Sequence, residues 1–360
     1  MTILENVSLA QYTTLGVGGA ARWFVKTAAE DEVLEGVRFA RAHAVPYFIL
    51  GGGSNLLVSD AGFPGVVIHI SGGESVWADQ GNGFGTIVSS AGVDWDSVVQ
   101  LAVEKNCAGI ECLAGIPGNV GGTPVQNVGA YGQEVSHTIV SVRALDLEAE
   151  RIVELTAADC GFAYRRSIFN TIQRERYAIT RVVYSLKIDG APLLEYRDVK
   201  QYFAERAIAT PSLSDTADAV RIIRARKGMV LAADDLDTHS AGSFFKNPVV
   251  VAATVPLLAA IAGRPISEVP QFPSDTWHAS GDEMVKLSAA WLIELAGFHK
   301  GFVAGRAGLS SKHVLAIINR GGATAAEIIA LRDNILERVH AKTGIRLEQE
   351  PVMLGFPPSR

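Results

Sequence analysis

Two glycine-rich segments dominate the chemistry that this sequence could perform. Gly51-Gly52-Gly53-Ser54-Asn55 follows an apolar run, and glycines there let backbone N–H groups approach an anion with no Cβ in the way. This segment alone is equally typical of a tight turn, because it matches neither G-x-G-x-x-G nor the Walker pattern. The second segment, residues 115–132, holds many glycines and amides and no charged side chain. A simple turn needs only two or three such residues, so the two segments together predict a bound dinucleotide.

A few polar side chains could act on a ligand held there. Arg165 could pair with a carboxylate or a phosphate, although a surface arginine is about equally consistent with its segment. Ser243 lies between a glycine and two phenylalanines, which predicts a hydroxyl in a cleft. Arg346, Glu348 and Glu350 alternate along a closing strand. Such a face is usually a solvated edge, but near a ligand a carboxylate beside an arginine can polarise a reacting group.

The elements that must position these residues begin with a predicted β-α-β unit. Residues 21–25 predict a strand, and Thr27 and Glu30 have capping-box spacing that predicts a helix starting near Thr27. Residues 45–50 predict a second strand that stops at the first glycine segment. Short apolar runs at 66–70, 86–90, 139–145 and 178–186 then alternate with glycine-rich loops, which is typical of an α+β fold with much sheet.

The last third of the chain is predicted to be helical again. A helix over 215–226 would place Arg224 and Lys227 at its C-terminal end, where cations usually complement the helix dipole at the surface. Thr324 and Glu327 form a second capping box, which predicts a helix that ends at Gly344. Strand-like runs at 314–318 and 345–354 flank it, so a further β-α-β unit is expected to close the chain.

The composition excludes several classes of protein. A chain of 360 residues predicts two or three structural units, and 48% hydrophobic with 19% charged residues predicts a sizeable core. The 32 basic and 38 acidic residues give a net charge of −6 with no basic block, which argues against nucleic-acid and membrane-surface partners. Three cysteines and eight scattered histidines lack metal-site spacing, so no metal is expected. With no signal peptide or membrane-spanning run, we expect a cytoplasmic protein.

Several separate blocks, taken in order, resemble one enzyme family. These blocks run from Thr14 to Gly355, and they resemble the UDP-N-acetylenolpyruvoylglucosamine reductases, flavoenzymes of peptidoglycan precursor synthesis. They read ILGGGSNLLVSD, ECLAGIPGNVGGTPVQNVGAYGQEV, CGFAYRRSIF, SAGSFFKNP, KLSAAWLIELAGFHKG and LEQEPVMLG. The segment 193–198 also resembles the tyrosine-bearing loop of the first type of this family.

The resemblance implies a particular α+β fold. It is an FAD-binding fold of the vanillyl-alcohol-oxidase type, built of two subdomains, followed by a C-terminal α/β substrate-binding domain. The implied boundaries are 1–72 for the first FAD-binding subdomain, 73–227 for the second, with 345–360 returning to it, and 228–344 for the substrate-binding domain.

The resemblance also implies the reaction. NADPH reduces non-covalently bound FAD, and hydride then passes to the enolpyruvyl ether of the UDP-sugar to give UDP-N-acetylmuramate. Hydride arriving at the β-carbon pushes negative charge onto the α-carbon and its carboxylate, which Arg165 and Glu350 would stabilise. Ser243 would donate the proton to the α-carbon. The alignment of the closing segment alone selects Glu350, and Glu348 is the alternative.

The remaining implied contacts are with the substrate and with FAD. Tyr196 would be a lid over the sugar nucleotide, and Lys227 would bind its diphosphate. The implied substrate contacts are Tyr131, Tyr164, Tyr196, Arg224, Lys227 and Asn247. The implied FAD contacts are Gly51, Gly52, Gly53, Ser54, Asn55, Ile116, Gly122, Thr123, Asn127, Gly129 and Ile179.

Two other functions compete with this one. An FAD oxidase of the same fold would share the glycine segments but not the SAGSFFKNP block. A non-catalytic module that binds a sugar nucleotide or a flavin would have no reason to keep a proton donor, an arginine and a carboxylate in one cleft.

Overall fold

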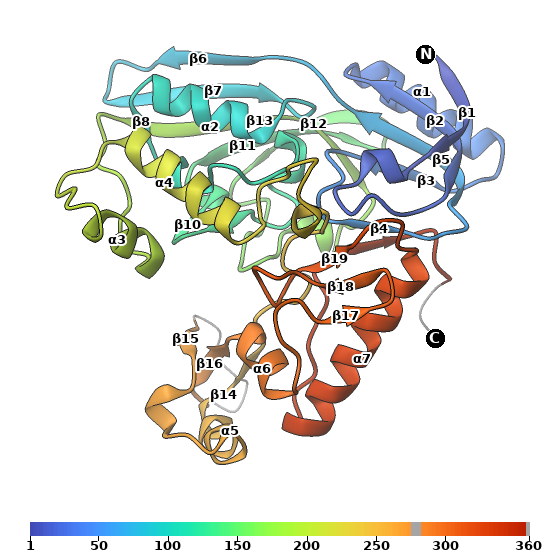
Figure 1. Cartoon of the computed structure of the whole chain (residues 1–360). Helices are drawn as coiled ribbons and strands as arrows, with labels where there is room; N and C mark the ends of the chain where they lie inside the picture. Colours follow the sequence, from blue (N-terminus) through green and yellow to red (C-terminus); the bar gives the residue numbers. More distant parts are fainter. Residues whose placement is uncertain (275–281, 358–360) are drawn as a thin grey trace. The chain divides into compact units, whose positions relative to one another are not determined.

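The computed structural model describes residues 1–274 and 282–357, and the chain divides into two compact units (Figure 1). The finer three-part division implied by the resemblance stays a prediction. No helix within the described residues is both long and apolar enough to cross a membrane. Unit 1 contains Met1–Ser8, Ala20–Gly53 and Gly62–Val230, and unit 2 contains Leu9–Gly19, Ser54–Ala61 and Leu231–Arg360.

Unit 1 begins with a four-stranded sheet that contains the predicted β-α-β unit. Strands β2 and β3 both pair in parallel with β5, which lies between them, and helix α1 connects them. The predicted capping box at Thr27 is wrong, because Thr27 is the last residue of β2 and pairs with Ile70. The bounds are β1 Ile3–Ser8, β2 Ala20–Thr27, α1 Glu30–Ala42, β3 Tyr47–Leu50 and β5 Phe63–Ile70.

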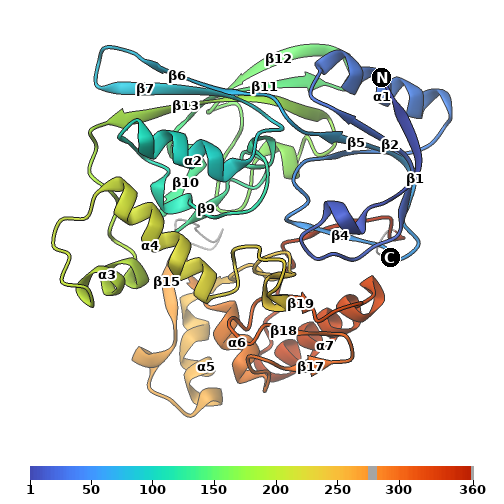
Figure 2. The same ribbon diagram turned by 45° about the horizontal axis from the view of Figure 1, so that its top comes forward.

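A second, antiparallel sheet forms most of unit 1. Its path is β12-β11-β13-β7-β6, with β8 pairing β13, and its strands contain the apolar runs predicted from 86 to 186. Helix α2 packs on it (Figure 2) through buried Trp95, whose ring lies 5.6 Å from that of Tyr184. The bounds of its elements are β6 Ser75–Asp79, β7 Phe84–Ser90, α2 Trp95–Glu104, β8 Cys107–Ala108, β11 Ile139–Asp146, β12 Arg151–Thr156 and β13 Tyr177–Ile188. Strands β9 (Gly129–Ala130) and β10 (Gln133–Glu134) pair with each other in a separate two-stranded sheet.

Two helices complete unit 1. Helix α4 (Leu213–Arg226) confirms the helix predicted over 215–226 and begins two residues earlier, because Ser212 and Asp215 form a capping box. Helix α3 (Arg197–Ala204) precedes it, and Tyr196 is its N-cap residue. Short 3-10 helices lie at Glu111–Leu113, Val120–Gly122, Val135–His137 and Ile168–Asn170.

Over its described residues, unit 2 combines small sheets with three α-helices. The capping box predicted for α7 is confirmed, since Thr324 Oγ accepts the Glu327 N–H at 3.1 Å and Glu327 accepts the Thr324 N–H at 2.9 Å. The helix ends at Gly344 as predicted, at a φ of +72°. The bounds are β4 Leu56–Val58, β14 Val249–Val251, α5 Val255–Ala262, β15 Gln271–Pro273, β16 Met284–Leu287, α6 Ala289–Leu295, β17 Val303–Ala304, β18 Ala307–Leu309, β19 Ile317–Asn319, α7 Ala325–Thr343 and β20 Val352–Leu354, with 3-10 helices at Ala10–Tyr12, Leu236–Thr238, Ala252–Thr254 and Ile266–Glu268.

The predicted closing β-α-β unit is wrong. Strand β19 belongs to the sheet β17-β18-β19, whereas β20 pairs in parallel with β4, so the strands that flank α7 lie in different sheets. Of the run predicted over 345–354, only the last three residues form a strand. Pro351 has no N–H to donate, and Gln349 pairs only in an isolated bridge with Phe245.

Candidate functional site

The two glycine segments meet in unit 1. A Cβ on Gly52 would lie 2.6 Å from Gly118 Cα and 2.9 Å from Asn119 N, so only glycine permits this approach. Asn119 Nδ2 donates to the carbonyl oxygen of Ile70 at 3.3 Å, which brings in the end of β5. Because β3 and β5 are parallel, their carboxyl ends lie at one edge of the sheet, where open α/β sheets bind ligands.

This edge offers groups that suit the phosphates and ribose of FAD. The backbone N–H groups of Gly51, Gly52 and Gly53 make no hydrogen bond to other described residues. A Cβ on Gly51 or Gly122 would meet nothing within 4 Å, so the chain leaves open space beside both. Ser71 Oγ is buried and has no hydrogen-bond partner among the described residues. An unpartnered buried hydroxyl beside free N–H groups fits an anionic ligand.

Ser71 was not predicted from the sequence. The signal was available, because Ser71-Gly72-Gly73 follows an apolar strand in the same way as the first glycine segment does. We add Ser71 to the candidate FAD contacts.

The other predicted FAD contacts of unit 1 lie in or beside the second glycine segment. The hydroxyls of Thr123 and Tyr184 are 2.8 Å apart in the core. The Asn127 amide donates to Glu134 Oε2 at 2.7 Å and accepts the Ser136 N–H at 3.1 Å. Both side chains therefore stabilise the loop itself. Ile116 is partly buried, and Ile179 is buried in β13.

Four predicted substrate contacts lie together in unit 1, and we call them the tyrosine–lysine cluster: Tyr131, Tyr196, Arg224 and Lys227. The rings of Tyr131 and Tyr196 are 5.1 Å apart and nearly perpendicular, and Lys227 Nζ lies 5.7 Å from the Tyr131 ring centroid. Burial raises the pKa of Tyr131 to about 12, although the nearby Arg224 charge opposes this shift. Arg224 Nε donates to the carbonyl oxygen of Gly115 at 3.2 Å, which ties the cluster to the second glycine segment.

A residue that the sequence did not single out completes the cluster. Asp198, in the first turn of α3, forms an ion pair with Lys227. Partial burial and the Asp198 charge raise the pKa of Tyr196. One weak signal for it is present in the sequence, an acidic residue two positions after the predicted lid tyrosine.

Arg165 lies against the second glycine segment. Its Nη2 donates to the carbonyl oxygen of Gly129 at 2.8 Å, and its guanidinium lies 5.5 Å from the Tyr164 ring centroid. The backbone of Arg165 has a φ of +55°, and its carbonyl oxygen accepts the side-chain amide of Asn170 at 3.1 Å. Arg165 is partly buried whereas Arg166 is exposed, so the two arginines of this pair differ in exposure.

Unit 2 pairs the segment that follows Ser243 with the segment that ends in Glu350. The Glu350 N–H donates to the carbonyl oxygen of Phe244 at 2.9 Å, and the Lys246 N–H donates to that of Glu348 at 2.9 Å. These bonds pair the segment after Ser243 with the closing segment. We call this arrangement the serine–glutamate rung. Phe244 and Phe245 are fully buried, while Ser243 is only partly buried.

The structure distinguishes the two candidate glutamates. The Glu348 side chain is 73% exposed and forms an ion pair with Lys246 at 2.5 Å. Arg346 and Glu348 are exposed, whereas Glu350 is partly buried. Glu350 therefore does not share the solvent-exposed face that was predicted for all three residues. A solvated ion pair is what a surface edge residue makes, and the geometry therefore favours Glu350 for chemistry.

The last residues of the first glycine segment belong to unit 2. Asn55 Nδ2 donates to the carbonyl oxygen of Glu350 at 3.2 Å, and the Val352 N–H donates to that of Asn55 at 2.9 Å. Ser54 O accepts a long hydrogen bond of 3.4 Å from the Thr14 hydroxyl. Asn247 Oδ1 accepts the Ala289 N–H at 2.9 Å, at the start of α6.

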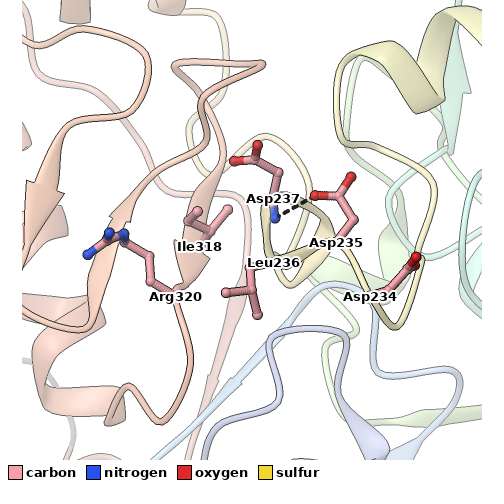
Figure 3. Close-up of a pocket in the computed structure, with 6 residues that line it drawn as sticks. All are labelled: Asp234, Asp235, Leu236, Asp237, Ile318 and Arg320. Atoms are coloured by element: carbon pink, nitrogen blue, oxygen red, sulfur yellow. Dashed lines mark hydrogen bonds between the residues drawn. The ribbon is translucent and has the colours of Figure 1, made fainter.

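An open, acidic pocket of unit 2 is lined by other residues (Figure 3). It has a volume of about 380 Å³, and Asp237 N–H donates to Asp235 Oδ1 at 3.1 Å within it. Asp235 also pairs with Lys312, and Asp237 accepts the Ser311 N–H at 2.7 Å. Carboxylates repel phosphates, so this cavity is a poor nucleotide site. Its lining residues are Asp234, Asp235, Leu236, Asp237, Ile318 and Arg320, none of which was a predicted site residue.

Comparison with known proteins agrees with this geometry. Residues 21–156 match the family model of an FAD binding domain, and residues 234–354 match that of the UDP-N-acetylenolpyruvoylglucosamine reductase C-terminal domain. The UDP-N-acetylenolpyruvoylglucosamine reductase of Thermobifida fusca is 43% identical over 98% of both chains. That of Ralstonia nicotianae is 37% identical over 98% of this chain and 100% of its own.

A solved structure points to the same family. The crystal structure of UDP-N-acetylenolpyruvylglucosamine reductase from Thermus caldophilus is 27% identical, covers 98% of both chains and superposes with a TM-score of 0.61. The expected fold class, an α+β FAD-binding fold with a C-terminal α/β domain, is confirmed, as is the expectation of an FAD-containing oxidoreductase. The chain belongs to the UDP-N-acetylenolpyruvoylglucosamine reductase family.

Proposed function

We propose that this protein reduces the enolpyruvyl group of UDP-N-acetylenolpyruvoylglucosamine to give UDP-N-acetylmuramate, with NADPH as the reductant and FAD as the electron carrier. The observation that carries the proposal is the serine–glutamate rung, in which the segment that follows Ser243 is hydrogen-bonded to the segment that contains Glu350, in a member of this family. The reaction would take place in the cytoplasm as a step of peptidoglycan synthesis, and so would serve cell shape, growth and division.

FAD would be held largely by backbone groups. Bound FAD supplies the redox chemistry, because it accepts electrons from NADPH and passes them to the substrate. On the protein side, the N–H groups of Gly51 to Gly53 and the Ser71 hydroxyl would bind its phosphates and ribose. Gly52 is required for the close approach to Gly118, so a larger residue there would separate the two glycine segments.

The tyrosine–lysine cluster would bind the sugar nucleotide. The cations of Arg224 and Lys227 offset the charge of a diphosphate, and Arg224 is fixed by the carbonyl oxygens of Gly115 and Met229. Tyr196 is 41% exposed, so its ring remains available to cover a ligand. Tyr164 and Asn247 are further proposed contacts.

Three side chains would act at the enolpyruvyl group. Hydride adds to the β-carbon, a proton adds to the α-carbon, and the carbon–carbon double bond becomes a single bond. The Arg165 guanidinium would complement the charge that develops on the substrate carboxylate, and Glu350 would polarise the same group. The Ser243 hydroxyl would give its proton to the α-carbon and recover one from water.

The test is an anaerobic absorbance titration of the purified protein. We expect a yellow protein that releases FAD on denaturation, is bleached by NADPH, and regains its colour when the enolpyruvyl sugar nucleotide is added. Protein that stays colourless with added FAD would overturn the cofactor assignment. Bleached protein that is reoxidised by oxygen but not by the sugar nucleotide would favour the FAD oxidase, and FAD that NADPH cannot reduce would favour a binding module.

A further inference from the structure

The proposed function assigns a role to Lys227 but none to Asp198, with which Lys227 forms an ion pair. Lys227 is the C-cap residue of α4, and Asp198 lies in the first turn of α3, 29 residues earlier in the chain. Both side chains are about one-third exposed, at 34% and 33%, so a ligand from solvent can reach the pair. The lysine proposed to bind the diphosphate therefore already holds a carboxylate.

Asp198 is also rigidly linked to the predicted lid. The N–H groups of Val199 and Lys200 donate to the carbonyl oxygen of Tyr196 at 3.1 and 3.0 Å, which makes Tyr196 and Asp198 part of one helix start. The Tyr196 ring contacts the Tyr131 ring, and the charge of Asp198 acts on both phenols, since it raises the pKa of each. The ion pair thus links the start of α3 to the end of α4, and the ring contact links the start of α3 to the second glycine segment. Figure 2 shows α3 and α4 as neighbouring helices of unit 1.

The sign of the electrostatic effect follows from Coulomb's law. A carboxylate that contacts Lys227 cancels most of the attraction that the ammonium group would exert on a phosphate. It also repels a phosphate that arrives at the same place. Because the pair is partly withdrawn from water, both effects are stronger than between fully exposed charges.

We propose that Asp198 is a built-in competitor for Lys227, a carboxylate that the diphosphate of the sugar nucleotide must displace, so that this one residue weakens binding and speeds release. The inference rests on the proposed function, because that function is what places a diphosphate on Lys227. In the absence of substrate, the charge of the Lys227 ammonium group is therefore neutralised by the Asp198 carboxylate. Fast release would serve turnover, since product release often limits an enzyme.

The test measures the dissociation constant of uridine diphosphate by calorimetry at low salt. Asp198→Asn keeps the shape of the side chain and an oxygen that can accept from Lys227, and it removes only the charge. We expect uridine diphosphate to bind about 3–10-fold more tightly to this variant and to dissociate more slowly, with the gain shrinking as salt is added. Glu205→Gln is the matched control, because it removes one negative charge from the other end of α3, at an exposed position beside Gln201. We expect no change from it.

A double-mutant cycle separates competition from a structural contribution of Asp198. In a Lys227→Ala background, Asp198→Asn should change the affinity for uridine diphosphate much less than in the parent. The reason is that the ammonium group for which carboxylate and diphosphate compete is then absent. Unchanged or weaker binding by Asp198→Asn in the parent, or the same gain with and without Lys227, would overturn the proposal. A parent enzyme that binds no uridine diphosphate at all would instead overturn the proposed function, and this inference with it.

Discussion

The two groups of proposed substrate residues are held in place by different means. In the tyrosine–lysine cluster, Lys227 and Tyr131 are positioned by other side chains, through the ion pair to Asp198 and a ring contact. In the serine–glutamate rung, the Glu350 backbone and the residues that follow Ser243 are positioned by main-chain hydrogen bonds of two paired segments. A residue fixed by its backbone can be changed without moving its neighbours, whereas a change in the cluster disturbs every partner. We therefore expect changes at the rung to affect the rate and changes in the cluster to affect binding.

The largest expected effect is at Ser243. Ser243→Ala should leave flavin reduction by NADPH nearly intact and slow reoxidation by the enolpyruvyl substrate by about 10²–10⁴-fold, because only the second half-reaction needs the proton. Rapid-mixing absorbance measurements of each half-reaction check this. Equal slowing of both half-reactions would indicate a misfolded variant. It would contradict the expectation that a change at the serine–glutamate rung affects only the rate of the second half-reaction.

Glu350 should come next. Glu350→Gln should retain FAD and substrate binding and lower turnover by about 10²–10³-fold, which corresponds to ~3–4 kcal/mol of lost transition-state stabilisation. The loss should appear in kcat more than in KM, as steady-state kinetics would show. Glu348→Gln is the matched control, and we expect it to change turnover little, because its side chain is exposed and pairs only with Lys246 among the described residues. A large loss at Glu348 with a small one at Glu350 would reverse the assignment.

The substitution Lys227→Ala tests the tyrosine–lysine cluster. Lys227→Ala should raise the KM for the sugar nucleotide by about 10–100-fold with a smaller effect on kcat, because a lysine meets a phosphate as a point charge. The KM for the sugar nucleotide should also lose most of its dependence on salt. An unchanged affinity for the sugar nucleotide would mean that Lys227 is a surface cation that only complements the dipole of α4.

The longer strands of unit 1 and helices α1, α4 and α7 were predictable because their patterns are local. The two capping boxes show where local patterns fail. Thr324 and Glu327 cap α7 as predicted, but Thr27 has the same spacing and does not cap α1. Thr27 pairs with Ile70 in the sheet, and its hydroxyl donates to Glu32 at 2.6 Å, so strand pairing overrides the capping signal and the helix starts three residues later.

The composition of the candidate site was more predictable than its assembly. The glycine segments and Arg165 could be identified from residue types, because backbone approach and charge require those types. The serine–glutamate rung could not be predicted from residue patterns, since it pairs irregular segments about a hundred residues apart with no periodicity. Asp198 was missed because an acidic residue in a first helical turn is already explained by the helix dipole.

A smaller effect is expected where the segment that carries Tyr196 is anchored. Glu111 is 1% exposed, and its carboxylate accepts the Leu193 N–H at 2.9 Å and the Gly109 N–H at 2.8 Å. Glu111→Gln replaces one acceptor oxygen by an amide that cannot accept, so it should raise the KM for the sugar nucleotide by about 2–5-fold and lower stability by about 1–3 kcal/mol. Kinetics and urea denaturation check this. Glu104→Gln, on the exposed face of α2, is the control, and equal effects of both variants would contradict an anchoring function of Glu111.

The smallest expected effect concerns pH and a side-chain contact that is remote from substrate chemistry. Asp146 is 1% exposed, accepts Arg176 Nη2 at 2.7 Å, and accepts the N–H groups of Glu148 and Ala149 at 3.1 Å. Arg176 lowers the pKa of this carboxyl despite its burial, so the unfolded chain binds the proton more readily. The stabilisation is therefore complete above the ordinary aspartate pKa of about 4 and is lost as the pH falls through the folded-state value. We expect Asp146→Asn to lower the melting temperature at pH 7 by a few degrees, and the gap to the parent should shrink below about pH 4, with kcat unchanged at pH 7. A gap that stays constant with pH would mean that the charge of Asp146 does not stabilise unit 1.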